Sequence, residues 1–211
     1  MGNTAIQWAD VVWGPVRGCS RVSEGCRNCY AERQASRFST PRWATDEDGE
    51  VRLVPGLFAG FVKSTAAGPR WTGKVELIPE KLDEPMHWRK PRRVFVNSMS
   101  DLFHESLPDA AIARVFGVMQ STPHHTYLVL TKRAARLPVW VEWFSTKWLD
   151  RGAYPNQYRH VQLGVSVEDQ ATADERIPLL LATPAAVRFV SAEPLLGPID
   201  FRFLQPGDPP T

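Results

Sequence analysis

From residue 74 onward, apolar runs alternate with amphipathic stretches, and this alternation constrains the fold more than any other feature. The β-like runs cover residues 74–78, 92–99, 126–133, 161–169 and 187–195. Helical stretches separate them, and Pro79 and Pro108 stand where the first turn of a helix tolerates proline. Near-continuous apolar strands separated by helices are typical of a parallel sheet covered by helices.

The segment around residues 5–13, taken as the first strand, brings the count to about six βα units, with the segment 40–72 as an irregular excursion that could contain a hairpin. We therefore expect an α/β fold, a partial (β/α) barrel, with an open doubly wound sheet as the alternative. In both folds, ligands bind at the carboxyl ends of the strands. We expect one domain over residues 1–205 and a frayed tail over 206–211.

Composition narrows the class of protein. The 211 residues carry 25 basic and 23 acidic side chains, a net charge of +2, and 43% are hydrophobic. These values exclude a disordered tail and a histone-like nucleic-acid coat, and no apolar run approaches the roughly 18–20 residues of a membrane helix. The N-terminus lacks the pattern of a signal peptide, so we expect a cytoplasmic protein.

The three cysteines, Cys19, Cys26 and Cys29, all lie within eleven residues. An odd number of cysteines without an export signal argues against a disulfide framework. Their C-x6-C-x2-C spacing resembles a set of metal ligands instead. Three thiolates suit a [4Fe–4S] cluster with one open iron, whereas a structural zinc site needs a fourth ligand, and the nearest downstream histidine is His87. The spacing alone leaves both metals open.

Polar side chains follow several of the expected strands. They are Asn97, Ser98, Ser100 and Asp101 after one strand, Lys132 after the next, Ser166 and Glu168 after the third, and Glu193 after the last. The cysteine loop follows the first strand, so it falls on the same rim. Each group alone could be a helix cap or a turn. Their convergence with the cysteines favours a bound polar ligand.

Five segments, WGPVRGCSRVSEGCRNCYAER, VFVNSMSDLFHE, HHTYLVLTKR, LGVSVED and SAEPLLGPI, resemble a phage and prophage protein family of unknown function with a three-cysteine motif. That family is regarded as radical S-adenosylmethionine (SAM)-like, although the superfamily's usual spacing is C-x3-C-x2-C. The resemblance implies a radical-SAM-like barrel whose open iron chelates the methionine amine and carboxylate of SAM. Family members continue past the last segment into a further strand, so we expect a domain that is short at its C-terminal end.

In the superfamily, aromatic residues beside this motif stack near the adenine, so Tyr30 would do so here or would pack the loop against the first helix. The strand-end residues have candidate roles from their chemistry. Asn97, Ser98, Ser100 and Asp101 would bind the cofactor amine or ribose, and Lys132 would bind a carboxylate or a phosphate. Glu168 and Glu193 would bind ribose hydroxyls or the amine. We expect reductive cleavage of SAM that modifies a substrate which the sequence does not name.

The alternative is a zinc-stabilised, non-enzymatic binding module acting between phage and host. A partner protein is a further candidate in either case. The basic stretch 88–93 is the one candidate for contact with nucleic acid, and we expect it to be a solvated face instead.

Overall fold

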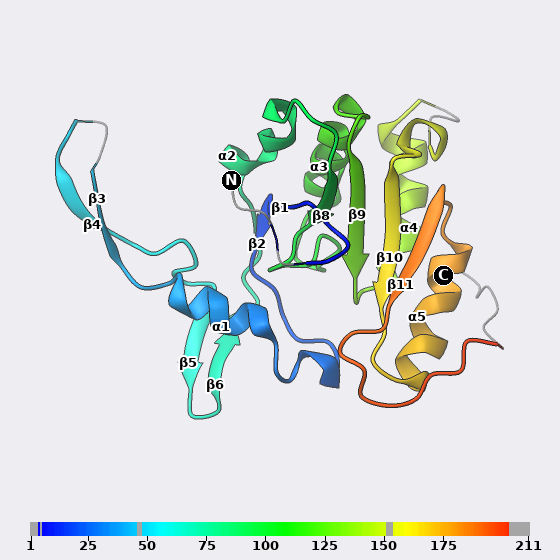
Figure 1. Ribbon diagram of the computed structural model, residues 1–211, viewed down its shortest axis with the longest axis horizontal. Helices are drawn as coiled ribbons and strands as arrows, with labels where there is room; N and C mark the ends of the chain where they lie inside the picture. Colours follow the sequence, from blue (N-terminus) through cyan, green and yellow to red (C-terminus); the bar gives the residue numbers. More distant parts are fainter. Residues whose placement is uncertain (1–3, 5, 46–47, 151–153, 203–211) are drawn as a thin grey trace.

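The computed structural model describes residues 4, 6–45, 48–150 and 154–202. Its largest element there is a sheet of five parallel strands (Figure 1). Their spatial order is β1 (Val11–Trp13), β8 (Arg93–Val96), β9 (Thr126–Thr131), β10 (Val161–Ser166) and β11 (Val187–Ser191). Because all the strands run in one direction, their carboxyl ends lie at the same edge of the sheet.

Three helices, α3 (Asp109–Ser121), α4 (Arg136–Trp143) and α5 (Gln170–Ala182), pack on one face of this sheet and share a core with it. A π-helical turn over Phe144–Trp148 continues α4. The helix α5 begins after Asp169, whose side chain accepts a hydrogen bond from the Thr172 N–H in a capping box. The sequence pattern of polar and apolar residues accounts for this cap and for the apolar faces of the helices.

The opposite face of the sheet is covered differently. Alternate strand residues, among them Phe95 and Leu130, point to this face because side chains alternate along a strand. Trp8 packs edge-on against Phe95, with ring centroids 4.6 Å apart. None of the three long helices contributes here, so this face has room for a cavity.

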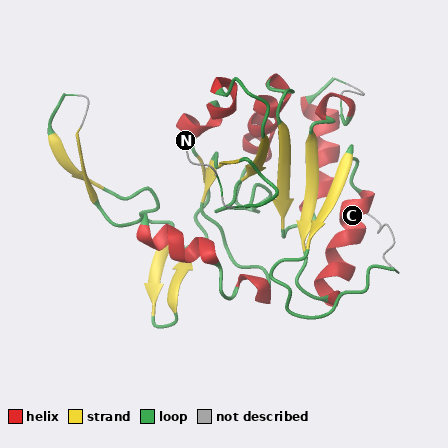
Figure 2. Ribbon diagram, viewed as in Figure 1, coloured by secondary structure: helices red, strands yellow, loops and turns green. Residues whose placement is uncertain are grey.

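The connection from β1 to β8 is long and contains small elements instead of one crossover helix (Figure 2). In chain order they are β2 (Val16–Arg17), the 3-10 turn Glu24–Cys26, α1 (Tyr30–Arg37), β3 (Arg42–Thr45), β4 (Val51–Val54), β5 (Val62–Thr65), β6 (Gly68–Trp71), β7 (Glu76–Leu77), α2 (Pro79–Leu82) and the 3-10 turn Glu84–His87. A last 3-10 turn, Asn156–Tyr158, precedes β10. The hairpin β3–β4 reaches far from the sheet (Figure 1).

The expected partial (β/α) barrel of about six βα units is wrong. The run 74–78 forms only β7, which pairs antiparallel with β2 outside the main sheet. In the described part of the chain the parallel sheet therefore has five strands, with β1 and β11 at its two edges, and the other strands form small antiparallel pairs. The doubly wound alternative fails as well, because α3, α4 and α5 share one face.

The predictions for the segment 40–72, the first strand and the end of the domain have different outcomes. The segment 40–72 holds two hairpins, and the first strand is confined to Val11–Trp13 instead of spanning residues 5–13. The predicted domain end at 205 and the tail 206–211 lie outside the described residues. None of the helices in the described part of the chain has the length and apolar character needed to cross a bilayer.

Phe116 tests the core between α3 and α4. Its ring is fully buried and lies against Trp140, Phe144 and Tyr158, with centroid separations of 4.6–5.8 Å. We expect Phe116→Ala to lower the free energy of unfolding by about 3–5 kcal/mol, because it removes apolar contacts and leaves a cavity. Urea unfolding measures the change. The control Val139→Ala, on the exposed side of α4, should change stability by less than about 0.5 kcal/mol; equal effects would contradict the packing described.

Candidate functional site

A cavity of about 590 Å³ lies at the carboxyl edge of the sheet, between the strand ends and the cysteine loop. It brings together all the residues predicted for the site except Glu168. Those lining it are Cys19, Cys26, Cys29, Tyr30, Asn97, Ser98, Ser100, Asp101, Lys132, Ser166 and Glu193. The polar strand ends and the cysteines therefore meet at one edge of the sheet, with Glu168 as the exception.

Asp101 holds the first part of the cysteine loop indirectly. Its carboxylate accepts hydrogen bonds from the Phe103 N–H (3.0 Å), the Thr131 hydroxyl (2.7 Å), the Lys132 N–H (3.1 Å) and the Arg133 guanidinium (3.1 Å). Four protein donors occupy both oxygens. The buried Asp101–Arg133 pair thus stabilises the protein framework. The Asp101 carboxylate is bonded to the protein where we expected it to bind a ligand.

The environment of Cys19 differs from that of an exposed thiol. Burial, together with the nearby Asp101 carboxylate, raises the pKa of Cys19 to about 12, and Arg133 acts in the opposite direction. Next to it, the Ser20 hydroxyl lies 2.8 Å from His104 Nε2. Burial and Arg133 lower the pKa of His104, so this ring stays neutral near pH 7. A metal at Cys19 would displace the thiol proton, as metals do for coordinating thiols.

Glu168 anchors the second part of the loop from behind the cavity wall. Its carboxylate, 1% exposed, pairs with Arg176 at 3.0 Å and with Lys132, and it accepts a hydrogen bond from the Ser23 hydroxyl at 3.1 Å. Gly25 packs directly on this side chain. Glu168 therefore holds the loop, and its side chain does not reach the cavity lining where a cofactor residue was expected.

A third buried carboxylate fixes the end of the loop. Glu32 of α1, 2% exposed, pairs with Arg21 at 2.6 Å and lies 3.7 Å from Arg70. It also accepts the backbone N–H of Trp71 at 3.0 Å. The loop, the first helix and the β5–β6 hairpin are thereby joined at one point.

Several polar groups of the cavity remain available to a ligand. The exposed Glu193 carboxylate forms no hydrogen bond or ion pair with any described residue, although its carbonyl accepts from Ser166 at 2.8 Å. Asn97 has a φ of +63°, in the left-handed region that asparagine tolerates better than most residues, and it accepts from the Val16 N–H through Oδ1. Its Nδ2 is buried and has no partner among the described residues. The Tyr30 hydroxyl donates to the Ser98 carbonyl.

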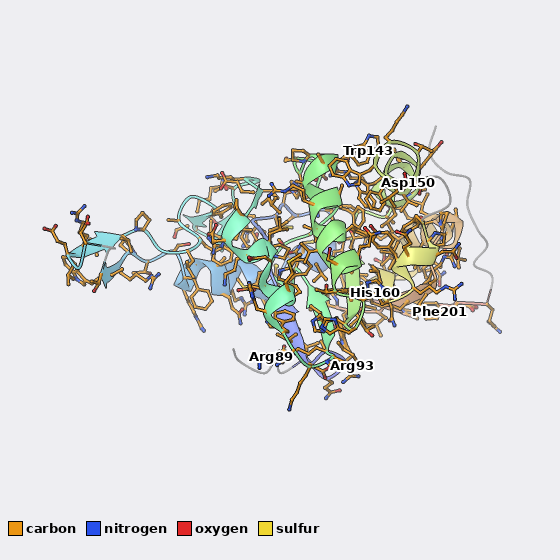
Figure 3. The ribbon with its side chains drawn as sticks, turned by 90° about the horizontal axis from the view of Figure 1, so that it is seen from above. Arg89, Arg93, Trp143, Asp150, His160 and Phe201 are labelled. Carbon is orange, nitrogen blue, oxygen red and sulfur yellow. The ribbon has the colours of Figure 1, made fainter. Side chains whose placement is uncertain are left out.

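Sequence reasoning missed the apolar wall of the cavity, formed by Ile6, Trp8, Trp71, Phe95 and Leu130. The alternation along β8 and β9 could have identified Phe95 and Leu130, since they face away from the helix layer. Nothing in the sequence pattern indicates that Trp8 and Trp71, from distant segments, join them. The basic stretch 88–93 leads into the amino end of β8, away from the carboxyl edge that carries the cavity. Figure 3 labels Arg89 and Arg93.

The three cysteines are free and partly exposed, and all of them line one cavity. Among the described residues, no three histidine, cysteine, aspartate or glutamate side chains are arranged to hold a metal ion. Three thiols match the number of protein ligands that a [4Fe–4S] cluster with one open iron requires. A structural zinc site would need a fourth ligand.

Comparison with known proteins gives a family. A family model described as "Protein of unknown function (DUF5131)" matches residues 3–205. The chain belongs to the DUF5131 family. No curated protein and no solved structure matches it. The description of the DUF5131 family names no activity, and the cavity is the feature of this DUF5131 protein that bears on its function.

Gly25 tests how the cysteine loop is held. A Cβ at this position would lie within 2.6 Å of three atoms of the Glu168 side chain, which Arg176 and Lys132 hold in place. We expect Gly25→Ala to lower the free energy of unfolding by about 1–3 kcal/mol through overpacking, measured by urea unfolding. Gly14→Ala, where a Cβ meets nothing within 4 Å, is the matched control. Equal stability of the two variants would show that the loop does not rest on Glu168.

Proposed function

We propose that this DUF5131 protein holds a [4Fe–4S] cluster on Cys19, Cys26 and Cys29 and cleaves SAM reductively to modify a substrate. The observation that carries the proposal is the shared cavity, in which three free thiols face the polar ends of parallel strands. Three thiolates leave one iron of a cube open, and the remaining polar groups are acceptors and donors suited to an amino acid and a ribose.

The cofactor pair would supply the difficult chemistry, and the chain would supply binding and orientation. A cluster held by Cys19, Cys26 and Cys29 would, once reduced by an external reductant, supply the one electron that cleaves SAM reductively at its sulfonium. The cavity leaves the identity of the substrate open.

On this proposal, each part of the cavity has a task. The Glu193 carboxylate, which has no partner among the described residues, would accept from the ammonium or the ribose hydroxyls. The aromatic wall of Trp8, Trp71 and Phe95 would give the adenine an apolar surface that also excludes water. Lys132, held by Glu168 and Ser166, would supply a positive charge for the cofactor carboxylate.

The proposed reaction would take place in the cytoplasm, which is that of the host cell if the chain is phage-encoded. Reductants that can reduce an iron–sulfur cluster are present there. The substrate could be presented by a partner protein. Nucleic acid is less well supported as a partner, because the basic stretch 88–93 lies at the opposite end of the sheet from the cavity.

The cluster is tested by anaerobic reconstitution with iron and sulfide. We expect about four irons and four sulfides per chain, absorbance near 400 nm and an EPR signal after reduction. Cys26→Ser and Cys29→Ser should each abolish retention of the cluster while circular dichroism stays unchanged, because the core lies in the sheet and its helices. One equivalent of zinc without absorbance near 400 nm, or unfolding on loss of one cysteine, would favour a structural zinc module instead.

Glu193 tests the SAM pocket separately. Glu193→Gln removes the free carboxylate while keeping its shape, and we expect roughly tenfold weaker binding of SAM to the reconstituted protein, because one charge-assisted hydrogen bond is lost. Titration calorimetry measures the affinity. Glu175→Gln, an exposed residue of α5 outside the cavity, is the control and should bind SAM like the unmodified protein. Unchanged affinity in the Glu193 variant, with its iron content intact, would remove this carboxylate from the pocket.

A further inference from the structure

Arg133 directs its guanidinium at the cysteine loop. Although cationic, it is only 8% exposed, and each of its three nitrogens has a partner. The Nε atom donates to Glu105 (2.9 Å), Nη2 to the Ser20 hydroxyl (2.8 Å) and carbonyl (3.1 Å), and Nη1 to Asp101 (3.1 Å). Nη1 also lies 3.9 Å from Cys19 Sγ, within hydrogen-bond reach of sulfur.

The other two cysteines have no comparable neighbour. The partner of Cys26 Sγ is the Ser23 hydroxyl at 4.0 Å. Arg21 interacts electrostatically with Cys26 and Cys29, but its guanidinium donates to Glu32 and to the Arg27 carbonyl. Among the described residues, Cys19 is thus the one thiol that receives a hydrogen bond from a positively charged side chain.

A hydrogen bond of this kind has an electronic consequence for a bound cluster. The reduction potential of an iron–sulfur cluster depends on its net charge, on hydrogen bonds to its sulfurs and on exposure. Arginine stays protonated at every accessible pH, so its charge beside Cys19 is permanent. Reduction adds one electron and makes the cluster more negative, and a buried cation that bonds to a ligand sulfur stabilises that added charge more than the oxidised form.

We infer that Arg133 is a positioning residue that raises the reduction potential of the cluster through Cys19, an inference that rests on the proposed function. Asp101 fixes the guanidinium in place and at the same time offsets part of its charge. The redox step itself is a one-electron addition: a reductant such as dithionite is oxidised, the cluster is reduced, and no bond to the protein forms or breaks.

Arg133→Gln tests the inference by redox titration of the reconstituted protein, followed by EPR. At a fixed solution potential, we expect the ratio of reduced to oxidised cluster to fall about tenfold, which corresponds to a midpoint about 59 mV lower for one electron. Arg136→Gln is the control, because Arg136 pairs with Asp109 and donates to carbonyls without contacting a cysteine. It should titrate like the unmodified protein.

Two further variants keep the test decisive if Arg133→Gln fails to hold a cluster. Arg133→Lys keeps the charge but loses the fork, so its midpoint should fall by less. Asp101→Asn removes the offsetting charge, so the midpoint potential of the cluster in this variant should rise. General loosening of the loop would not shift the midpoints of the Arg133→Lys and Asp101→Asn variants in opposite directions. Unchanged midpoints in the variants that hold a cluster would overturn the inference. Failure of the unmodified protein to bind a cluster would instead overturn the proposed function.

Discussion

Buried carboxylates paired with arginines hold the cysteine loop on the sheet, and the candidate site depends on them. Asp101, Glu168 and Glu32 lie almost fully inside the protein, and each receives a guanidinium together with backbone or hydroxyl donors. Such pairs add little net stability, because desolvation offsets their attraction, but removal of one partner is costly. Their effect here is positional: an irregular, glycine-containing loop acquires one arrangement relative to the strand ends.

This arrangement separates charges that serve the framework from charges left for a ligand. Polar residues follow several of the strands in the sequence, yet both carboxylate oxygens of Asp101 and of Glu168 accept from protein donors. Glu193 follows β11 and is exposed, and its carboxylate has no partner among the described residues. The distinction arises from burial, since a buried carboxylate has to be satisfied by the protein, whereas an exposed one is satisfied by water until a ligand replaces it.

The sequence predicted the strands after residue 92, their helices and the meeting of polar strand ends with the cysteines. Those predictions rest on local patterns that the core enforces. Closure of the sheet could not be predicted in the same way, because it depends on how β1 and β11 lie relative to each other. The run 74–78 has the composition of a strand but pairs with β2, a choice made by tertiary contacts. Arginine partners that come from distant positions, such as Arg133 for Asp101, leave no pattern in the sequence that would identify them.

The β3–β4 hairpin has a consequence for the motions of the molecule. Its paired residues Trp43 and Leu53 are 69% and 56% exposed, and the hairpin extends away from the sheet (Figure 1). Two strands alone are marginally stable in water, and few buried contacts tie this unit to the core. Its backbone amides should therefore exchange with solvent through local opening, at rates set by the hairpin and independent of global unfolding. The amides of β9, at the centre of the sheet, report the stability of the whole.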